Sequence, residues 1–394
     1  MRWAIAPAGS MHSNKRLSEM RRGLSRFCAA KWDCPPLRHG KNRRRALTAP
    51  PRRARFLPAI SKTLRAALAA SAIVACLVAA GCGRGGTSAA GNTAPKMGLL
   101  PKLIGISYFT ASEKGAREAA AELGVDLDFD GPSVDSAEEQ VKMIDRWIAQ
   151  GYDMIAVAPN DPELIAPALR RAKQAGITVL TWDADANPDA SQRETFVNQA
   201  PIDEIGTTLV DLLGEALGGT GQTIIVTGSA TSPNQNAWIK AMRRRVDEKF
   251  PRLELLETLV SDEDQSKAYR LTRDAINAHP DLKGIWAITS VSLPGAAKAV
   301  RDAGKADAIF VTGLSLPNTM REYVEDGTIK KFVLWSPVDL GYLTVHVAHR
   351  LRAGKLSDGE QTIGRLSNIR VSPGEVLLGP PKIFDRANIG QYDF

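Results

Sequence analysis

Short apolar runs alternate regularly with amphipathic stretches of helical length from residue 102 to about residue 353. Each run has the length of a buried strand, and most of the amphipathic stretches end near a glycine, which is a good helix stop. Strand–helix alternation of this kind predicts a parallel sheet with helices on both of its faces. The chain is therefore predicted to belong to the α/β class.

The alternation falls into two similar units in series, because the pattern restarts after Asn198 and Gln199. The predicted strands of the first unit cover residues 102–109, 125–129, 154–158 and 177–182, and those of the second cover 223–228, 253–260, 284–288, 308–313 and 330–335. Between them lie predicted helices over 112–123, 136–151, 162–175, 202–217 and 234–250, followed by helices that end near Ala278, Ala303 and Ala353. Residues 355–394 are expected to be irregular with short strands. With 394 residues the chain is long enough for two domains of ordinary size.

The net positive charge is confined to one end of the chain, which decides whether it indicates a nucleic-acid partner. The formal net charge of the chain is +8. Residues 1–65 contain 17 lysines and arginines against Glu19 and Asp33, so this segment carries +15 and the remaining residues carry −7. The part with the α/β pattern is therefore acidic. It offers no basic surface for nucleic acid, and we expect no nucleic-acid partner.

The cysteines are distributed in the same uneven way. All four lie in the first 82 residues, which leaves the 312 residues after Cys82 without a cysteine. No disulfide framework or cysteine metal site can exist in that part. A cysteine-free body suits an oxidising compartment outside the cytoplasm.

A short apolar run, residues 66–81, follows a basic stretch and ends directly before Cys82. It is shorter than the roughly 20 apolar residues of a membrane-spanning helix and has the order of an export signal. Ala79-Ala80-Gly81-Cys82 resembles a bacterial lipoprotein cleavage box, although leucine is more usual at the first position. Residues 1–81 are thus predicted to be a leader and signal, Cys82 the lipid-bearing residue and 82–100 a flexible tether. The alternatives are an uncleaved signal anchor and a soluble exported protein.

Polar and aromatic side chains gather just after the predicted strands, where ligands of open α/β sheets bind. Carboxylates and amides form paired hydrogen bonds with neighbouring hydroxyls, and an aromatic face covers the apolar side of a sugar ring. The pattern therefore favours a polyhydroxylated ligand, with candidate residues Phe109, Trp182, Asp183, Asp185, Asn234 and Trp335. Several have a second interpretation: Asp183 as a turn cap, Trp182 and Trp335 as core residues, and Asn234 as the N-cap of its helix.

No catalytic motif or metal site is evident in the sequence. The G-x-S-x-G and H-E-x-x-H patterns are absent, and no cysteine follows Cys82 to act as a nucleophile. His346 and His349 lie three residues apart on a predicted helix without a third ligand in view, so we interpret them as packing or surface residues. We therefore expect a protein without enzymatic activity, cofactor or metal.

Several segments, in this order and spacing, resemble the bacterial periplasmic autoinducer-2-binding proteins, which belong with the rhamnose- and ribose-type sugar-binding proteins of ABC importers. The resemblance covers essentially all of residues 101–394. It is carried by PKLIGISYF (101–109), LTWDAD (180–185), NQNAW (234–238), LPGAA (293–297), NTMREYVEDGTIKKFVLW (318–335) and NIGQYDF (388–394).

The resemblance implies two Rossmann-like lobes joined by three hinge crossings, near Pro201, Ser336 and Ser367. On this basis the N-terminal lobe would comprise 101–200 with 336–366, and the C-terminal lobe 201–335 with 367–394. The resemblance also places ligand contacts on Lys102, Asp183, Gln235, Pro294 and Ala296, the last two through backbone groups.

The sequence departs from the autoinducer-2 receptors at two positions. Those receptors carry acidic residues where this chain has Asn234 and Ser336. Asparagine offers a donor as well as an acceptor, whereas an ionised aspartate only accepts, and a site built for one hydrogen-bond pattern rejects another. We therefore expect a pentose, a deoxyhexose or a similar small polyol, with Asp185 supplying a compensating carboxylate.

Together these features predict a monomeric binding protein in the periplasm or cell envelope, held to the membrane by a lipid. Hinge closure would trap a small sugar or polyol and present it to the membrane subunits of an ABC importer. The main alternative is a receptor for an autoinducer-2-like signal. A sugar-responsive transcription regulator would need a helix-turn-helix ahead of the core, which residues 1–60 do not provide, and no motif supports an exported enzyme.

Overall fold

The computed structural model describes residues 94–394. Its first strand, β1 (Lys96–Leu100), pairs in parallel with β2 (Asp126–Phe129) and β3 (Met154–Val157). This strand replaces the one expected over 102–109 and occupies the last five residues of the expected tether over 82–100. The apolar pattern extends from Met97 to Phe109 and does not by itself locate the strand. Pro101 has no N–H to donate and follows the strand, and Ser107 already begins the helix α2 (Ser107–Leu123).

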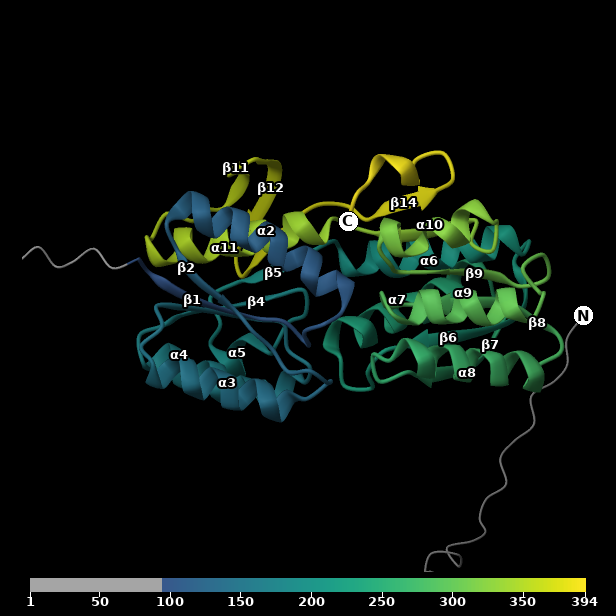
Figure 1. Cartoon of the computed structure of the whole chain (residues 1–394), viewed down its shortest axis with the longest axis horizontal. Helices are drawn as coiled ribbons and strands as arrows, with labels where there is room; N and C mark the ends of the chain where they lie inside the picture. Colours follow the sequence, from purple (N-terminus) through teal and green to yellow (C-terminus); the bar gives the residue numbers. More distant parts are fainter. Residues whose placement is uncertain (1–93) are drawn as a thin grey trace, which may run out of the picture. The chain divides into compact units, whose positions relative to one another are not determined.

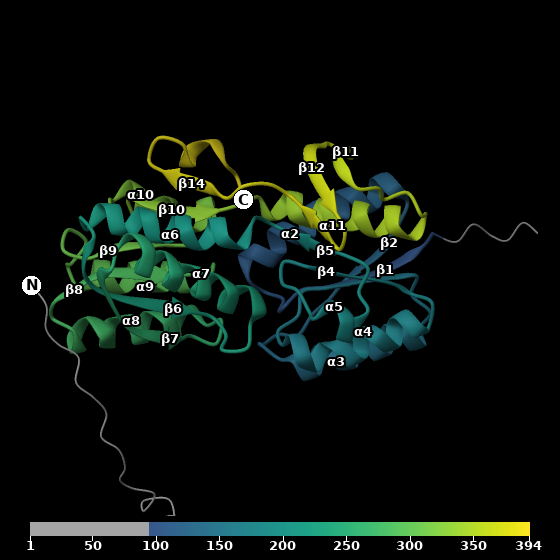
Figure 2. The same cartoon turned by 180° about the vertical axis from the view of Figure 1, so that it is seen from behind.

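The sheet of the N-terminal lobe has eight strands in the order β11-β12-β13-β5-β4-β3-β1-β2. Its parallel part continues from β3 into β4 (Thr178–Trp182) and β5 (Phe196–Asn198), which are joined by the short helix α5 (Pro188–Ser191). Helices α3 (Ala137–Ala149) and α4 (Pro162–Gln174) cover one face, and α2 and α11 (Pro337–Arg352) cover the other (Figures 1 and 2). Successive side chains of β3 point to opposite faces of the sheet, and each face has its own hydrophobic core. Ile155 and Val157 face α3 and α4, whereas Met154 and Ala156 belong to the core on the opposite face.

The C-terminal lobe is built on a second parallel sheet, in the order β7-β6-β8-β9. Its strands are β6 (Thr220–Thr227), β7 (Arg252–Val260), β8 (Leu282–Ala287) and β9 (Phe310–Gly313). Its helices are α6 (Ile202–Ala216), α7 (Pro233–Lys249), α8 (Gln265–Ala278), α9 (Ser292–Asp302) and α10 (Pro317–Glu325). Helix α6 packs against α7, and α8 packs against α9. The predicted α/β class with two Rossmann-like lobes is confirmed.

The chain passes between the lobes three times. It leaves β5 for α6 across residues 199–201, and it returns from β10 (Lys331–Leu334) to α11 across Trp335 and Ser336. After α11, β11 (Gly359–Ile363), β12 (Leu366–Ser372) and β13 (Glu375–Leu377) extend the first sheet, and β13 pairs in parallel with β5. Then β14 (Lys382–Asp385) pairs with β10 of the C-terminal lobe, and a 3-10 helix, η2 (Ile389–Gln391), follows it.

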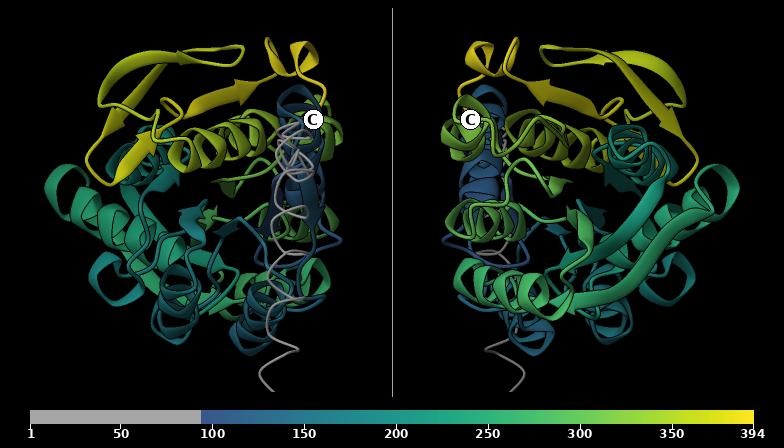
Figure 3. Two further views of the ribbon diagram at one scale, coloured as in Figure 1. Left: turned by 90° about the vertical axis from the view of Figure 1, so that its left-hand side faces the viewer. Right: turned by 90° about the vertical axis from the view of Figure 1, so that its right-hand side faces the viewer.

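The third crossing therefore lies at residues 378–381 and not near Ser367, which corrects the expected boundary. Residues 367–377 belong to the sheet of the N-terminal lobe, because Val371 and Val376 are buried there and β13 covers the edge of β5. Figures 1 and 3 show these C-terminal segments in yellow, lying along one side of both lobes.

Side-chain caps fix the starts of several helices. Ser136 begins α3 by accepting a hydrogen bond from the Glu139 N–H at 3.2 Å, and Ser336 does the same for Asp339 of α11 at 3.1 Å. In residues 94–394 no helix has the length and apolar character needed to cross a membrane. The predicted signal and Cys82 lie outside the described residues.

Candidate ligand-binding site

A cavity lies at the carboxyl ends of the strands, between the two lobes. Its empty volume is about 420 Å³, part of which is open to solvent. The cavity is lined by Lys102, Ile106, Tyr108, Phe109, Asp183, Asn234, Gln235, Trp238, Glu263, Ile288, Thr289, Ser290, Leu314, Leu334 and Trp335.

Lys102 connects the two lobes at the cavity. It follows β1 and is only 5% exposed. Its ammonium group donates to Ser232 Oγ at 2.7 Å and to Asn234 Oδ1 at 2.6 Å, both at the start of α7 in the other lobe. Its Nζ lies 3.8 Å from the Asp183 carboxylate. Because an ammonium has three donors, one remains free to be directed at Asp183 or at a ligand.

Asp183 follows β4 in a left-handed conformation, with φ of 61°. Its Oδ1 accepts a hydrogen bond from the Tyr108 hydroxyl at 2.7 Å, and its Oδ2 accepts one from Asn234 Nδ2 at 3.3 Å. The carboxylate therefore faces the cavity and does not cap a turn, which settles the second interpretation of this residue. Burial raises the pKa of Asp183, although the nearby Lys102 ammonium and the Tyr108 hydrogen bond act in the opposite direction.

Asn234 is the second residue of α7, and the N-cap of that helix is Ser232. The N-cap interpretation of Asn234 is therefore wrong. Its amide oxygen accepts from Lys102, and its amide nitrogen donates to the Asp183 backbone oxygen at 3.1 Å. A single asparagine thus uses its acceptor for the cation and its donor for the acidic residue. An ionised aspartate at this position could satisfy only the cation.

Gln235 lines the cavity, but its amide is committed to the protein. Its Oε1 accepts from Thr227 Oγ1 at 2.7 Å and from the backbone N–H groups of Gly228 and Ser229 at 2.9 and 3.0 Å. Its Nε2 donates to Glu263 Oε1 at 2.6 Å. The two backbone donors fix which end of the amide is oxygen.

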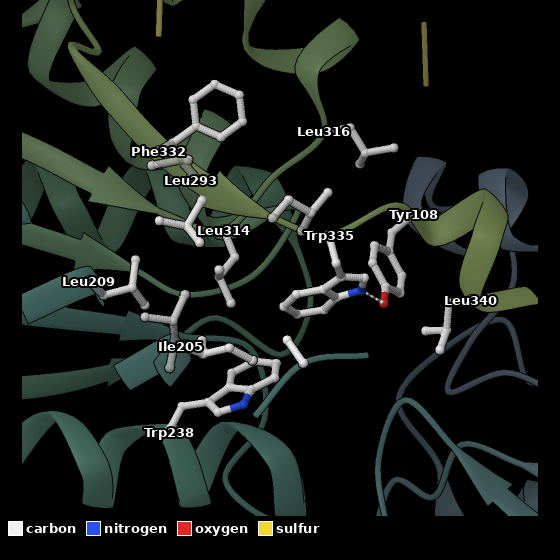
Figure 4. Packing of buried hydrophobic residues seen from close by; sticks show 14 of the residues in the cluster. Tyr108, Ile205, Leu209, Trp238, Leu293, Leu314, Leu316, Phe332, Trp335 and Leu340 are labelled. Carbon is white, nitrogen blue, oxygen red and sulfur yellow. Dashed lines mark hydrogen bonds between the residues drawn. The ribbon is translucent and has the colours of Figure 1, made fainter. Parts of the chain in front are cut away.

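Aromatic side chains form the wall of the cavity next to the hinge (Figure 4). Trp335, at the second crossing, donates from Nε1 to the Tyr108 hydroxyl at 2.8 Å, and the two rings meet edge to face with centroids 6.2 Å apart. Trp238 of α7 contacts the other side of Trp335, at 5.9 Å between centroids. Trp335 is 3% exposed and lines the cavity, so it is a core residue that also forms part of the cavity wall, and its contact with a ligand stays a prediction. Burial raises the pKa of Tyr108 well above 10.0, so its hydroxyl stays protonated.

Four of the predicted site residues lie away from the cavity. Trp182 is fully buried, donates to the Leu100 backbone oxygen and packs edge to face against Phe109. Asp185 is held by Arg193 at 2.5 Å and by Thr181, so it does not supply the expected compensating carboxylate. Pro294 and Ala296 are buried in α9, and their backbone contacts to a ligand stay a prediction. Ser336, the second departure from the autoinducer-2 receptors, caps α11.

Among the aromatic and charged residues that line the cavity, three were not predicted as site residues: Tyr108, Trp238 and Glu263. Tyr108 was assigned to a strand, whereas it lies in the first turn of α2. Trp238 was quoted only as part of a resemblance. Glu263 follows β7, and no site residue was predicted after that strand. The signal that could have found Glu263 is the acidic run Asp262-Glu263-Asp264 at that strand end.

Within the described residues no group of three or more His, Cys, Asp or Glu side chains is arranged to hold a metal ion. His346 is buried, and its Nε2 lies 3.2 Å from Glu122 Oε2, while the Tyr342 hydroxyl donates to the same oxygen at 2.6 Å. His346 therefore packs between α11 and α2, as one of the two interpretations predicted.

The comparisons with known proteins agree with this geometry. Residues 97–356 match the periplasmic binding protein domain family, and the chain belongs to that family. Among curated relatives, the D-ribose/D-allose-binding protein of Pseudomonas aeruginosa is 23% identical over 73% of this chain and 89% of its own length. The D-apiose import binding protein of Paraburkholderia graminis is 28% identical over 58% of this chain and 71% of its own length.

Two solved structures share both the fold and part of the sequence. An ABC transporter solute-binding protein from Clostridium phytofermentas with bound L-rhamnose is 30% identical, with a TM-score of 0.71, and the match covers 76% of this chain and 98% of that one. LsrB from Clostridium saccharobutylicum in complex with AI-2 is 26% identical, with a TM-score of 0.72, over 76% of this chain and 100% of that one.

Proposed function

We propose that this protein binds a small sugar or sugar-like polyol outside the cytoplasmic membrane and delivers it to an ABC importer by hinge closure. The observation that carries the proposal is the cavity between the lobes, in which buried polar groups face aromatic rings. Lys102, Asp183 and Asn234 would hold the hydroxyls, and Phe109 and Trp335 would cover the apolar face of the ligand. The protein would act as a carrier and not as an enzyme.

Hinge closure is supported by the contacts that already join the lobes. Lys102 in the N-terminal lobe reaches Ser232 and Asn234 in the C-terminal lobe, and Thr231 donates to the Asn160 backbone oxygen at 3.0 Å. These bonds form only when the lobes are together. A ligand that binds to both lobes adds further bonds between them. Because it then binds the closed form more tightly than the open form, it shifts the population toward the closed form.

The ligand class is narrowed by the apolar side of the cavity. Ile288, Leu314 and Leu334 line it together with Trp238. Such a wall accommodates a methyl or methylene group better than a further hydroxyl, because an unpaired buried hydroxyl is costly. A deoxyhexose or pentose fits this division, and the 30% identical relative holds L-rhamnose.

A thermal-shift panel tests the proposal. Purified residues 94–394 would be heated with L-rhamnose, D-ribose, D-allose, D-apiose, D-arabinose, D-fucose and D-tagatose. A sugar present at about 100 times its Kd should raise the unfolding free energy by about 2.7 kcal/mol, which is a clear rise in Tm. No shift with any member of the panel would contradict sugar binding.

We also propose that the mature protein is a monomer held at the membrane by a lipid on Cys82. This rests on the basic stretch, the apolar run and the cleavage-box resemblance of the sequence, and on the family's place outside the cytoplasm. In cells, Cys82→Ser should move the protein from the membrane fraction to the soluble fraction. An unchanged distribution would argue against the anchor, and the mass of the native protein would give its oligomeric state.

A second candidate ligand is autoinducer-2, because one structural relative at 26% identity holds it. The bond from Asn234 to Asp183 argues for a different hydrogen-bond pattern in this chain. Calorimetry with autoinducer-2 and with the best sugar of the panel decides between them, since a site matched to one should bind the other much more weakly.

A further inference from the structure

We propose that Glu263 is a ligand-binding and specificity-determining residue of the C-terminal lobe, and that Gln235 positions it. Glu263 would accept hydrogen bonds from the ligand, so the site would select a ligand that donates, either a hydroxyl or an ammonium group, and reject sugar acids. This inference rests on the proposed function and names the recognition chemistry of the same site.

Gln235 has little left to offer a ligand. Its amide oxygen already accepts three hydrogen bonds, from one hydroxyl and two backbone N–H groups. One hydrogen of its Nε2 is used by Glu263 Oε1 at 2.6 Å. The amide is therefore anchored to the loop after β6, and its donor end points at the Glu263 carboxylate. This is the arrangement of a residue that orients another.

The backbone also holds Glu263 in place. Asp262 and Glu263 both have φ of 53°, in the left-handed region that non-glycine residues rarely adopt. Such a conformation costs free energy and persists only where the surroundings impose it, and it is frequent at ligand sites. The Glu263 carboxylate lies against Gly228, where an added Cβ would be 2.0 Å from Glu263 Oε1. The carboxylate thus occupies the space that a side chain at position 228 would need, next to the loop after β6.

The charges of the cavity decide the ligand class. Two carboxyl groups, Asp183 and Glu263, line it together with one ammonium, Lys102. Lys102 already donates to Ser232 and Asn234. Burial raises the pKa of Glu263, although the Lys102 ammonium and the Gln235 bond oppose this effect. A ligand carboxylate or phosphate would place a further negative charge beside Asp183 and Glu263. Hydrogen-bond donors of a ligand would instead pair with the oxygens of these two carboxyl groups.

Calorimetry on matched variants tests the assignment, with the sugar of the panel that binds most tightly as the probe. Glu263→Gln keeps the shape and removes the charge, and we expect its Kd to rise about tenfold or more. Asp262→Asn is the control, because it removes a neighbouring exposed carboxylate, which pairs with Lys267 outside the cavity. Its Kd should stay within about twofold of the wild type. The aldonate of the same sugar should bind at least about tenfold more weakly than the sugar.

Gln235→Glu tests the positioning role. This variant keeps the acceptor for Thr227, Gly228 and Ser229 and replaces the donor to Glu263 by a like charge. We expect the affinity to fall at neutral pH and to recover as the pH is lowered and one carboxyl of the pair is protonated. A residue that only supports the loop would give a loss that does not depend on pH.

The outcomes separate the inference from the function on which it rests. Sugar binding by the wild type with an unchanged Kd in Glu263→Gln overturns the inference and leaves the proposed function intact. Binding of the aldonate as tightly as the sugar overturns the ligand class. If Glu263→Gln does not fold, the pH-dependence of Gln235→Glu decides. If the wild type binds no sugar, the proposed function fails and the inference fails with it.

Discussion

Lys102 Nζ in one lobe and Asn234 Oδ1 in the other lie 2.6 Å apart, and both side chains are buried. The same asparagine donates to the backbone oxygen and the carboxylate of Asp183. Three residues from two lobes thus form one connected set around the cavity. A polar set of this kind is strong when every member is satisfied and costly when one is not.

Asn234→Asp should weaken this set. The new carboxylate could still accept from Lys102, but it would lose the donor to Asp183 and place a like charge beside it. We expect the unfolding free energy to fall by about 1–3 kcal/mol, measured by urea denaturation at neutral pH. Asn277→Asp on the exposed face of α8 is the control and should change stability by at most about 0.5 kcal/mol. Equal losses in both variants would contradict the role given to Asn234.

Tyr108→Phe should lower sugar affinity. The tyrosine hydroxyl accepts from Trp335 and donates to Asp183, so its removal leaves an indole N–H unpaired and frees one carboxylate oxygen. The hydrogen bond from Tyr108 holds the pKa of Asp183 down, so the variant should raise that pKa further. We expect Kd to rise about tenfold, measured by calorimetry. Tyr152→Phe removes a similar bond to Asp128 outside the cavity, and it should leave Kd unchanged.

The sequence predicted the fold well because the fold depends on repeated patterns. Strand–helix alternation located the second to fourth strands of the first sheet and all four strands of the second to within a few residues. It misplaced β1, because the apolar run continues past Pro101 into α2. It also misplaced the third crossing, because the pairing of β13 with β5 joins residues nearly 180 positions apart, which no local pattern reports.

The site was predicted less completely than the fold, for a physical reason. Asp183, which directly follows β4, and Asn234, at the start of the helix after β6, were found because the carboxyl ends of the strands point to the cavity. Which carboxylates face the cavity depends on the partner that each side chain has. Asp185 is paired with Arg193, eight residues further on, and Glu263 is drawn into the cavity by Gln235 of another element. Side-chain pairing of this kind cannot be derived from spacing in the sequence.

Asp185→Asn tests whether Asp185 stabilises the fold through Arg193 and takes no part in ligand binding. Arg193 is 8% exposed in its side chain and binds both oxygens of Asp185, so removing the charge leaves a buried guanidinium with a weaker partner. We expect a loss of about 1–3 kcal/mol in the unfolding free energy and no change in Kd for the sugar. Asp145→Asn, which breaks the more exposed pair with Arg171, should cost less than about 1 kcal/mol. A large change in Kd for Asp185→Asn would restore Asp185 to the site.

Acidification should weaken the packing of α11 against α2 through His346. Burial lowers the pKa of His346 below 6.5, although the Glu122 carboxylate favours the charged ring. The folded state therefore binds this proton less readily than the unfolded chain. Its stability is fully present above about pH 6.5, and it falls as the pH drops from there toward the lowered pKa. Urea denaturation between about pH 8 and pH 5 measures this slope.

His346→Gln should flatten the slope in that window, because the ring that must charge in the unfolded chain is gone. His349→Gln is the matched control, because it makes the same substitution on the same helix at a half-buried position. The carboxylate of Glu122 affects the pH dependence of the unfolding free energy at lower pH, since its pKa is lowered chiefly by the Tyr342 hydroxyl. If both histidine variants keep the wild-type slope between about pH 6.5 and pH 5, His346 is not its source.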